Sequence, residues 1–104
     1  MGRLIYGGAD SFEVEERALA HLRLVIMNKL RRDESFFLHL PHGGGVRSLW
    51  IDASMPLVLS FVGSRPATIN RDWIEALMES ANSSYGLQIV REPDTTVLRD
   101  PLQA

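Results

Sequence analysis

The stretch from Gly63 to Arg71 combines hydroxyl, amide and guanidinium side chains immediately before an expected helix. The start of a helix presents unbonded backbone N–H groups and the positive end of the dipole, which together favour anions. We therefore predict an anion-binding site for a phosphate or a carboxylate, formed by Ser64, Arg65, Thr68, Asn70 and Arg71. The alternative is that Asn70 only caps the helix and that Arg65 pairs with a surface acid.

Two histidines three positions apart, His39 and His42, could both reach one metal ion. No nearby carboxylate pattern completes such a site, so we expect two surface histidines and no metal. The glycine-rich run 41–45 lacks the Lys-Ser/Thr pair that opens a helix in a phosphate loop. An enzyme would need a pocket that brings His39 or His42 to carboxylates from elsewhere in the fold. We therefore expect no catalytic residues and no cofactor.

Two aromatic residues, Phe37 and Trp50, alternate outward from the expected strands 35–40 and 47–52. Aromatic side chains on an open sheet face suit either a protein interface or stacked bases. Eleven basic residues stand against thirteen acidic ones, a net charge of −2, which gives no basic footprint for nucleic acid. The sequence therefore favours Phe37 and Trp50 as a homodimer interface and argues against a nucleic-acid partner.

Helical periodicity and turn residues define the elements that position these side chains. Apolar residues recur every three to four positions over 15–32, and Asn70 precedes a second helical pattern over 71–81. A hairpin is expected over 3–6 and 11–14. Strands are expected over 35–40, 47–52 and 57–62, with short connections typical of an antiparallel meander and 57–62 as a central strand. A last strand covers 87–90. The prediction is an α+β fold of order β-β-α-β-β-β-α-β, an antiparallel or mixed sheet with two helices packed on one face.

The length and composition indicate a single domain. The chain has 104 residues, 45% hydrophobic and 23% charged, with no cysteine. We predict one α+β domain over 1–91 and a polar C-terminal tail over 92–104. The apolar runs fall short of the ~20 residues of a membrane span, and the N-terminus lacks the apolar core of a signal peptide. We expect a bacterial cytoplasmic protein with no membrane partner.

The most specific block of the sequence runs from Gly63-Ser64-Arg65-Pro66 to Trp73-Ile74-Glu75-Ala76-Leu77. Together with other stretches over roughly residues 1 to 93, it resembles a small actinobacterial family of stand-alone proteins whose function is uncharacterised. Genome records often label members of that family "ATP-dependent DNA ligase". The resemblance implies no activity here, because a ligase adenylylates a lysine in a Lys-x-Asp-Gly motif and the single lysine, Lys29, precedes Leu-Arg-Arg.

Two functions from different classes follow from the sequence. The first is a non-enzymatic binding or homodimeric interaction module that uses Phe37 and Trp50. The alternative is an accessory protein that binds an anion, a nucleotide or nucleic acid at the start of the second helix.

Overall fold

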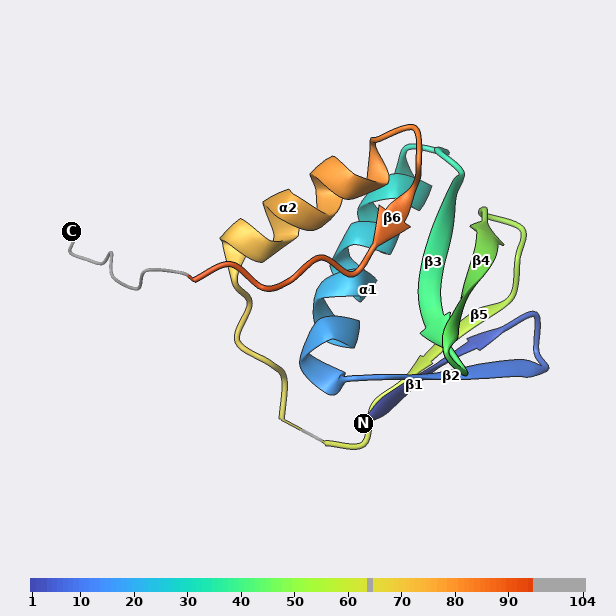
Figure 1. Ribbon diagram of the computed structural model, residues 1–104, viewed down its shortest axis with the longest axis horizontal. Helices are drawn as coiled ribbons and strands as arrows, with labels where there is room; N and C mark the ends of the chain where they lie inside the picture. The colour runs from blue at the N-terminus through green and yellow to red at the C-terminus, as the bar shows by residue number, and fades with distance from the viewer. Residues whose placement is uncertain (64, 95–104) are drawn as a thin grey trace.

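The computed structural model describes residues 1–63 and 65–94, which form eight elements (Figure 1). The predicted α+β class and the predicted element order are confirmed. In chain order the elements are β1 (Gly2–Tyr6), β2 (Asp10–Val14), α1 (Glu16–Arg31), β3 (Phe36–His42), β4 (Gly45–Ile51), β5 (Leu57–Ser60), α2 (Arg71–Ala81) and β6 (Leu87–Gln88).

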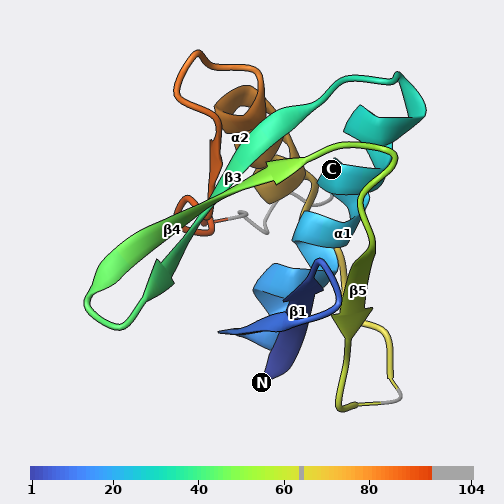
Figure 2. The ribbon, with the colours of Figure 1, turned by 90° about the vertical axis from the view of Figure 1, so that its right-hand side faces the viewer.

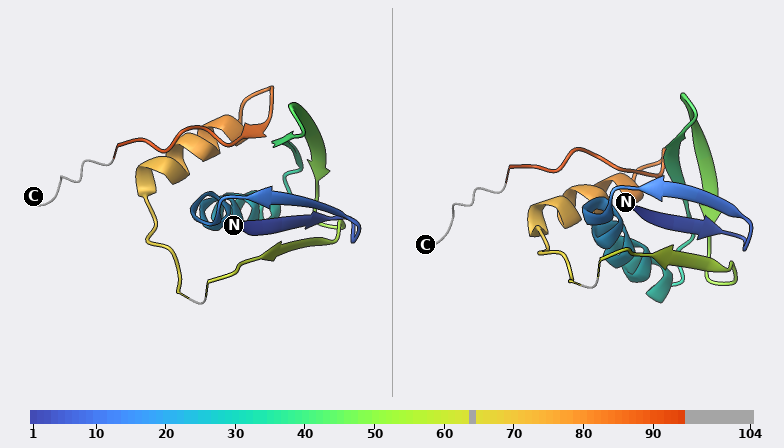
Figure 3. Two further views of the ribbon diagram at one scale, coloured as in Figure 1. Left: turned by 60° about the horizontal axis from the view of Figure 1, so that its bottom comes forward. Right: turned by 90° about the horizontal axis from the view of Figure 1, so that it is seen from below.

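Helix α1 is the centre of the fold. Its apolar stripe is buried along the whole helix, including Ala18, Leu22 and Val25, as the helical period predicts. The helix contacts β1 on one side and α2 on another. Figure 3 shows α1 end-on, with the β1–β2 hairpin and β5 beside it and α2 across from them. The core therefore forms around this one helix.

The six strands form two three-stranded sheets, in the orders β2-β1-β5 and β4-β3-β6. The expected meander is therefore wrong in its third strand. Strand β5 pairs with β1, placing Leu59 opposite Leu4, and it lies at a sheet edge rather than at the centre. Figure 2 shows the β3–β4 hairpin running away from β1 and β5. Residues 52–56 thus carry the chain from one sheet to the other, and a short connection does not by itself make neighbours.

The β3–β4 hairpin is longer than the sequence suggests. We expected a loop over 41–45, but β3 continues to His42 and β4 begins at Gly45. The turn is only Gly43-Gly44, whose φ angles of 55° and 84° are typical of a two-residue hairpin turn. Pro41 lies opposite Val46 within the ladder. Because β6 pairs with β3 only at Leu38 and His39, this end of β3 can accommodate a residue without an N–H.

Helix α2 begins and ends where its sequence pattern predicts. Asn70 is the N-cap, and its side chain accepts from the N–H groups of Asp72 and Trp73. After α2 the chain forms β6, which pairs parallel to β3, so the second sheet is mixed. Of the predicted tail, Glu92 and Pro93 hydrogen-bond to Asn70, and residues 95–104 lie outside the described part. No helix among the described residues is long and apolar enough to cross a membrane.

Candidate functional site

The start of α2, where the sequence predicts an anion site, is occupied by the side chain of Asn70. Its Oδ1 accepts from the backbone N–H of Asp72 at 3.0 Å and of Trp73 at 3.3 Å. Its Nδ2 donates to Glu92 Oε2 at 2.9 Å and to the Pro93 carbonyl at 3.2 Å. Asn70 is buried. Two of the N–H groups that would attract an external anion are therefore bonded within the chain.

Arg17 and Glu92 form a bidentate ion pair beside Asn70. Arg17 Nε and Nη2 donate to the two Glu92 oxygens at 3.0 and 2.7 Å, and Nη1 donates to the Thr68 carbonyl at 2.8 Å. The Arg17 guanidinium, and after it the Asn70 amide, lowers the pKa of Glu92 from 4.5 to about 2. The same pair raises the pKa of Arg17. The pair ties α1 to the segment before α2 and to the segment after β6.

His21 completes this polar cluster from inside the protein. It is fully buried, and its Nδ1–H donates to the Arg17 carbonyl at 2.7 Å. Its Nε2 accepts the Asn70 backbone N–H at 2.9 Å, which requires the neutral Nδ1–H tautomer. The ring lies 4.5 Å from that of Trp73, whose Nε1–H donates to Val90. We call Arg17, His21, Asn70, Trp73 and Glu92 the α1–α2 junction.

The sequence pattern did not lead us to predict Arg17, His21 or Glu92 as site residues. A usable signal for His21 was present, because Ala18, His21, Leu22 and Val25 have the i, i+3, i+4, i+7 spacing of one buried face. No such signal exists for Arg17 and Glu92, which are 75 positions apart.

The structure describes four of the five residues of the predicted anion site and places them in different surroundings. Ser64 lies outside the described residues. Asn70 and the carbonyl of Thr68 belong to hydrogen bonds of the junction. Arg71 is exposed and is not among the residues that line the adjoining cavity, whereas Arg65 is. Anion binding at the start of α2 remains a prediction, and the geometry moves attention from that helix end to the cavity beside Arg65.

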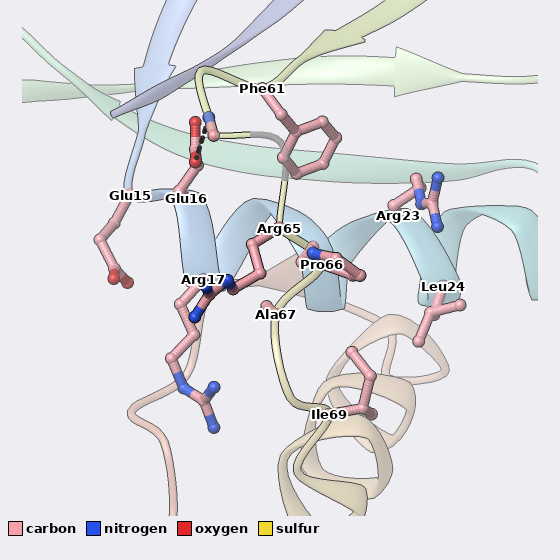
Figure 4. Close-up of a pocket in the computed structure, with 12 residues that line it drawn as sticks. Glu15, Glu16, Arg17, Arg23, Leu24, Phe61, Arg65, Pro66, Ala67 and Ile69 are labelled. Carbon is pink, nitrogen blue, oxygen red and sulfur yellow. Dashed lines mark hydrogen bonds between the residues drawn. The ribbon is translucent and has the colours of Figure 1, made fainter.

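This cavity has a volume of about 650 Å³ and lies between α1 and the segment that joins β5 to α2 (Figure 4). Its α1 side carries Ala20, Arg23 and Leu24, and its other side carries mostly apolar residues, among them Phe61 and Ile69. The first turn of α1 is tied to the same segment, because the Glu16 carboxylate accepts the N–H groups of Val62 and Gly63. These two bonds lower the pKa of Glu16.

The outer face of the second sheet carries an exposed row of rings. Phe37 and Trp50 lie opposite each other on β3 and β4, with their ring centroids 5.1 Å apart in an edge-to-face arrangement. Each is 45% exposed. The row continues through His39 to Tyr85, whose rings stack at 4.3 Å, and Tyr85 is 57% exposed. We call Phe37, His39, Trp50 and Tyr85 the outer aromatic face.

His39 is fixed within this row by two hydrogen bonds. Its Nε2–H donates to the Tyr85 carbonyl at 2.7 Å, and its Nδ1 bonds to the Ser48 hydroxyl at 2.7 Å. A serine on a histidine nitrogen is an arrangement that nucleophilic catalysis uses, but neither Ser48 nor His39 lines the cavity beside Arg65. His42 lies against the Phe12 ring instead. Within residues 1–63 and 65–94 no group of three His, Asp or Glu could hold a metal ion.

Lys29, the single lysine, is built into the core. It is buried, and its Nζ donates to Asn82 Oδ1 at 2.7 Å and pairs with Glu34 at 3.1 Å. It also lies 5.9 Å above the Phe36 ring. These contacts join the end of α1 to the end of α2, and they leave the amine committed to structural partners.

The described residues define a small α+β domain with an internally bonded polar junction, an aromatic sheet face and a cavity flanked by Arg23 and Arg65. The chain belongs to the family described as a domain of unknown function, DUF7882, whose model matches residues 1–92. No curated protein and no solved structure matches the chain at a significant level.

Proposed function

We propose that this domain is a non-enzymatic interaction module of the bacterial cytoplasm, and that it forms a homodimer through the adjoining edge of β4 and the Phe37–Trp50 end of the outer aromatic face. The observation that carries the proposal is the exposed edge-to-face pair of Phe37 and Trp50 on a well-bonded sheet. Aromatic rings presented by a rigid strand supply large contact area at little cost in conformational entropy.

The free edge of β4 lies next to these rings and supports a strand-pairing partner. Strand β4 is terminal in its sheet, so its outer edge pairs with no strand in the described chain. The Tyr6 hydroxyl donates to the Trp50 carbonyl at 2.8 Å, which leaves the rest of this edge for a partner strand. The other three edge strands have features that disfavour pairing with another chain, namely charged side chains or a short length. Strand β2 carries Asp10 and Glu13, while β5 and β6 have only four and two residues. Strand β4 has seven residues, no proline and a single charge, Arg47.

A second copy of the chain is the partner that best fits this edge. Two antiparallel β4 strands related by a two-fold axis present the same surface to each other, which is the commonest symmetry of homo-oligomers. The resulting sheet would be continuous, with Trp50 of each copy close to the junction between the copies. The outer aromatic face carries no arginine or lysine, so it offers no charge for a phosphate backbone.

Light scattering coupled to size exclusion tests the proposal on the wild type, Trp50→Glu and Val58→Glu. Val58 is the matched control, because it is 52% exposed and lies on β5 at an edge of the other sheet. We expect a wild-type mass near twice 11.7 kDa, a folded Trp50→Glu monomer and a Val58→Glu dimer. A wild type that is monomeric up to millimolar concentration contradicts the proposal, as does equal dissociation by both substitutions.

A further inference from the structure

We propose that the cavity between α1 and residues 61–63 and 65–69 binds a small apolar molecule that carries one anionic group, a carboxylate or a phosphate monoester. The site is separate from the outer aromatic face, so this inference goes beyond the proposed dimer and does not depend on it.

The two described parts of the segment above α1, residues 61–63 and 65–69, are held over the helix at both ends. Glu16 accepts the N–H of Gly63 at 3.1 Å and also that of Val62. The next residue, Arg17, donates to the Thr68 carbonyl at 2.8 Å. Adjacent residues of α1 therefore fix the two ends of the segment, and the cavity lies between these anchors (Figure 4).

The lining of the cavity is mainly apolar, and the protein's own side chains do not fill the cavity. Leu24 lines it from α1, and Phe61 and Ile69 line it from the covering segment. Phe61 is 36% exposed and Ile69 is 40% exposed, so both present apolar surface that the protein does not cover. The small side chain of Ala20 leaves room at the helix surface. A volume of about 650 Å³ is within the range of small-molecule sites.

Two cations at this cavity have no partner in the described chain. Arg23 and Arg65 line it from opposite sides, and neither forms a hydrogen bond or an ion pair with residues 1–63 or 65–94. The acids at the cavity behave differently. Glu16 is bonded to two N–H groups, whereas the Glu15 carboxylate forms no hydrogen bond or ion pair within residues 1–63 or 65–94 and lies at the start of α1, two helical turns from Arg23. An apolar lining with two free guanidinium groups fits an apolar anion better than a neutral or cationic ligand.

The experiment titrates sodium octanoate and octyl phosphate into the full chain and follows backbone amide chemical shifts. Octan-1-ol and acetate supply the chain without the charge and the charge without the chain. We expect one saturable site with a dissociation constant of about 1 mM or tighter, shifts at α1 and residues 61–69, and weaker binding of octan-1-ol and acetate. The ratio between octanoate and octyl phosphate identifies which anionic group is preferred.

Three substitutions place the ligand, and one controls for charge. Arg23→Ala and Arg65→Ala should each weaken octanoate binding about tenfold, and Ala20→Leu should weaken it by narrowing the cavity at the helix surface. Arg71→Ala removes an exposed arginine that does not line the cavity and should leave binding unchanged. Should Ala20→Leu unfold the domain, the exposed arginine variants still decide the question.

The proposal is overturned by any of three results. The first is no saturable octanoate binding, and the second is octan-1-ol binding as tightly as octanoate. The third is binding that depends on Arg71 rather than on Arg65 and Arg23, which would return the anion to the start of α2.

Discussion

The α1–α2 junction and the outer aromatic face each contain a histidine and a tryptophan, but the junction is bonded within the chain and the face is exposed to solvent. At the junction every polar group of Asn70, His21 and Glu92 described above has a partner inside the chain. On the outer face the Phe37 and Trp50 rings contact each other and are 45% exposed, beside a strand edge that pairs with no other strand of the described residues. Residue type alone therefore does not separate a stabilising cluster from a binding surface. The difference lies in whether the partner is already present.

The largest expected effect tests the junction as a structural element. Asn70→Ala removes the cap and both contacts of Nδ2, and we expect it to lower the free energy of unfolding by about 3 kcal/mol. Asn70→Ser retains a capping oxygen and loses the contacts with Glu92 and Pro93, so it should recover about half of that loss. Urea denaturation measures both variants.

The same variant also tests whether the junction affects dimer formation. Because Asn70 is remote from β4, the folded fraction of Asn70→Ala should retain the wild-type dimer affinity. A change of less than about 0.5 kcal/mol in the free energy of unfolding would mean that the hydrogen bonds of Asn70 do not stabilise the junction. A loss of dimerisation without unfolding would mean that the two regions are coupled.

A smaller effect is the pH dependence that Glu92 gives to stability. Its folded-state pKa of about 2 lies below its ordinary value of 4.5, so the stabilisation is complete above pH 4.5 and is lost as the pH falls towards 2. We expect the wild type to exceed Glu92→Gln by about 1 kcal/mol or less near neutral pH, because the pair is partly exposed to solvent. Denaturation curves at several pH values should show this difference shrinking in acid. A difference that is constant with pH would contradict the assignment.

The sequence predicts local elements well and non-local pairing poorly. The buried stripe of α1 and the Asn70 cap depend on residues within one or two helical turns. Local periodicity and the capping preference of asparagine were therefore sufficient to predict them. The partner of β5 is β1, more than fifty residues earlier, and the half-buried Leu57 and Leu59 pack against the core from there. No short-range pattern contains this information.

The same limit applies to the candidate sites. The alternation of side chains along a strand was enough to predict that Phe37 and Trp50 lie on the same outer face. Tyr85 joins them only through the chain path after α2. For the predicted anion residues, the sequence identified both the cap and the cationic character. It could not show that Asn70 bonds to Glu92, or that Arg65 lies over a cavity with Arg23, because both depend on how α1 packs against distant segments.

Amide hydrogen exchange at low and high protein concentration tests the central contrast most directly, since it reports both regions in one sample. We predict that the backbone N–H groups of β4 exchange more slowly as concentration rises, because a second copy pairs with its free edge. The N–H groups of Asn70 and Trp73 should exchange at a rate that does not depend on concentration, because their acceptors belong to the same chain. Exchange in β4 that is unaffected by concentration would contradict the account.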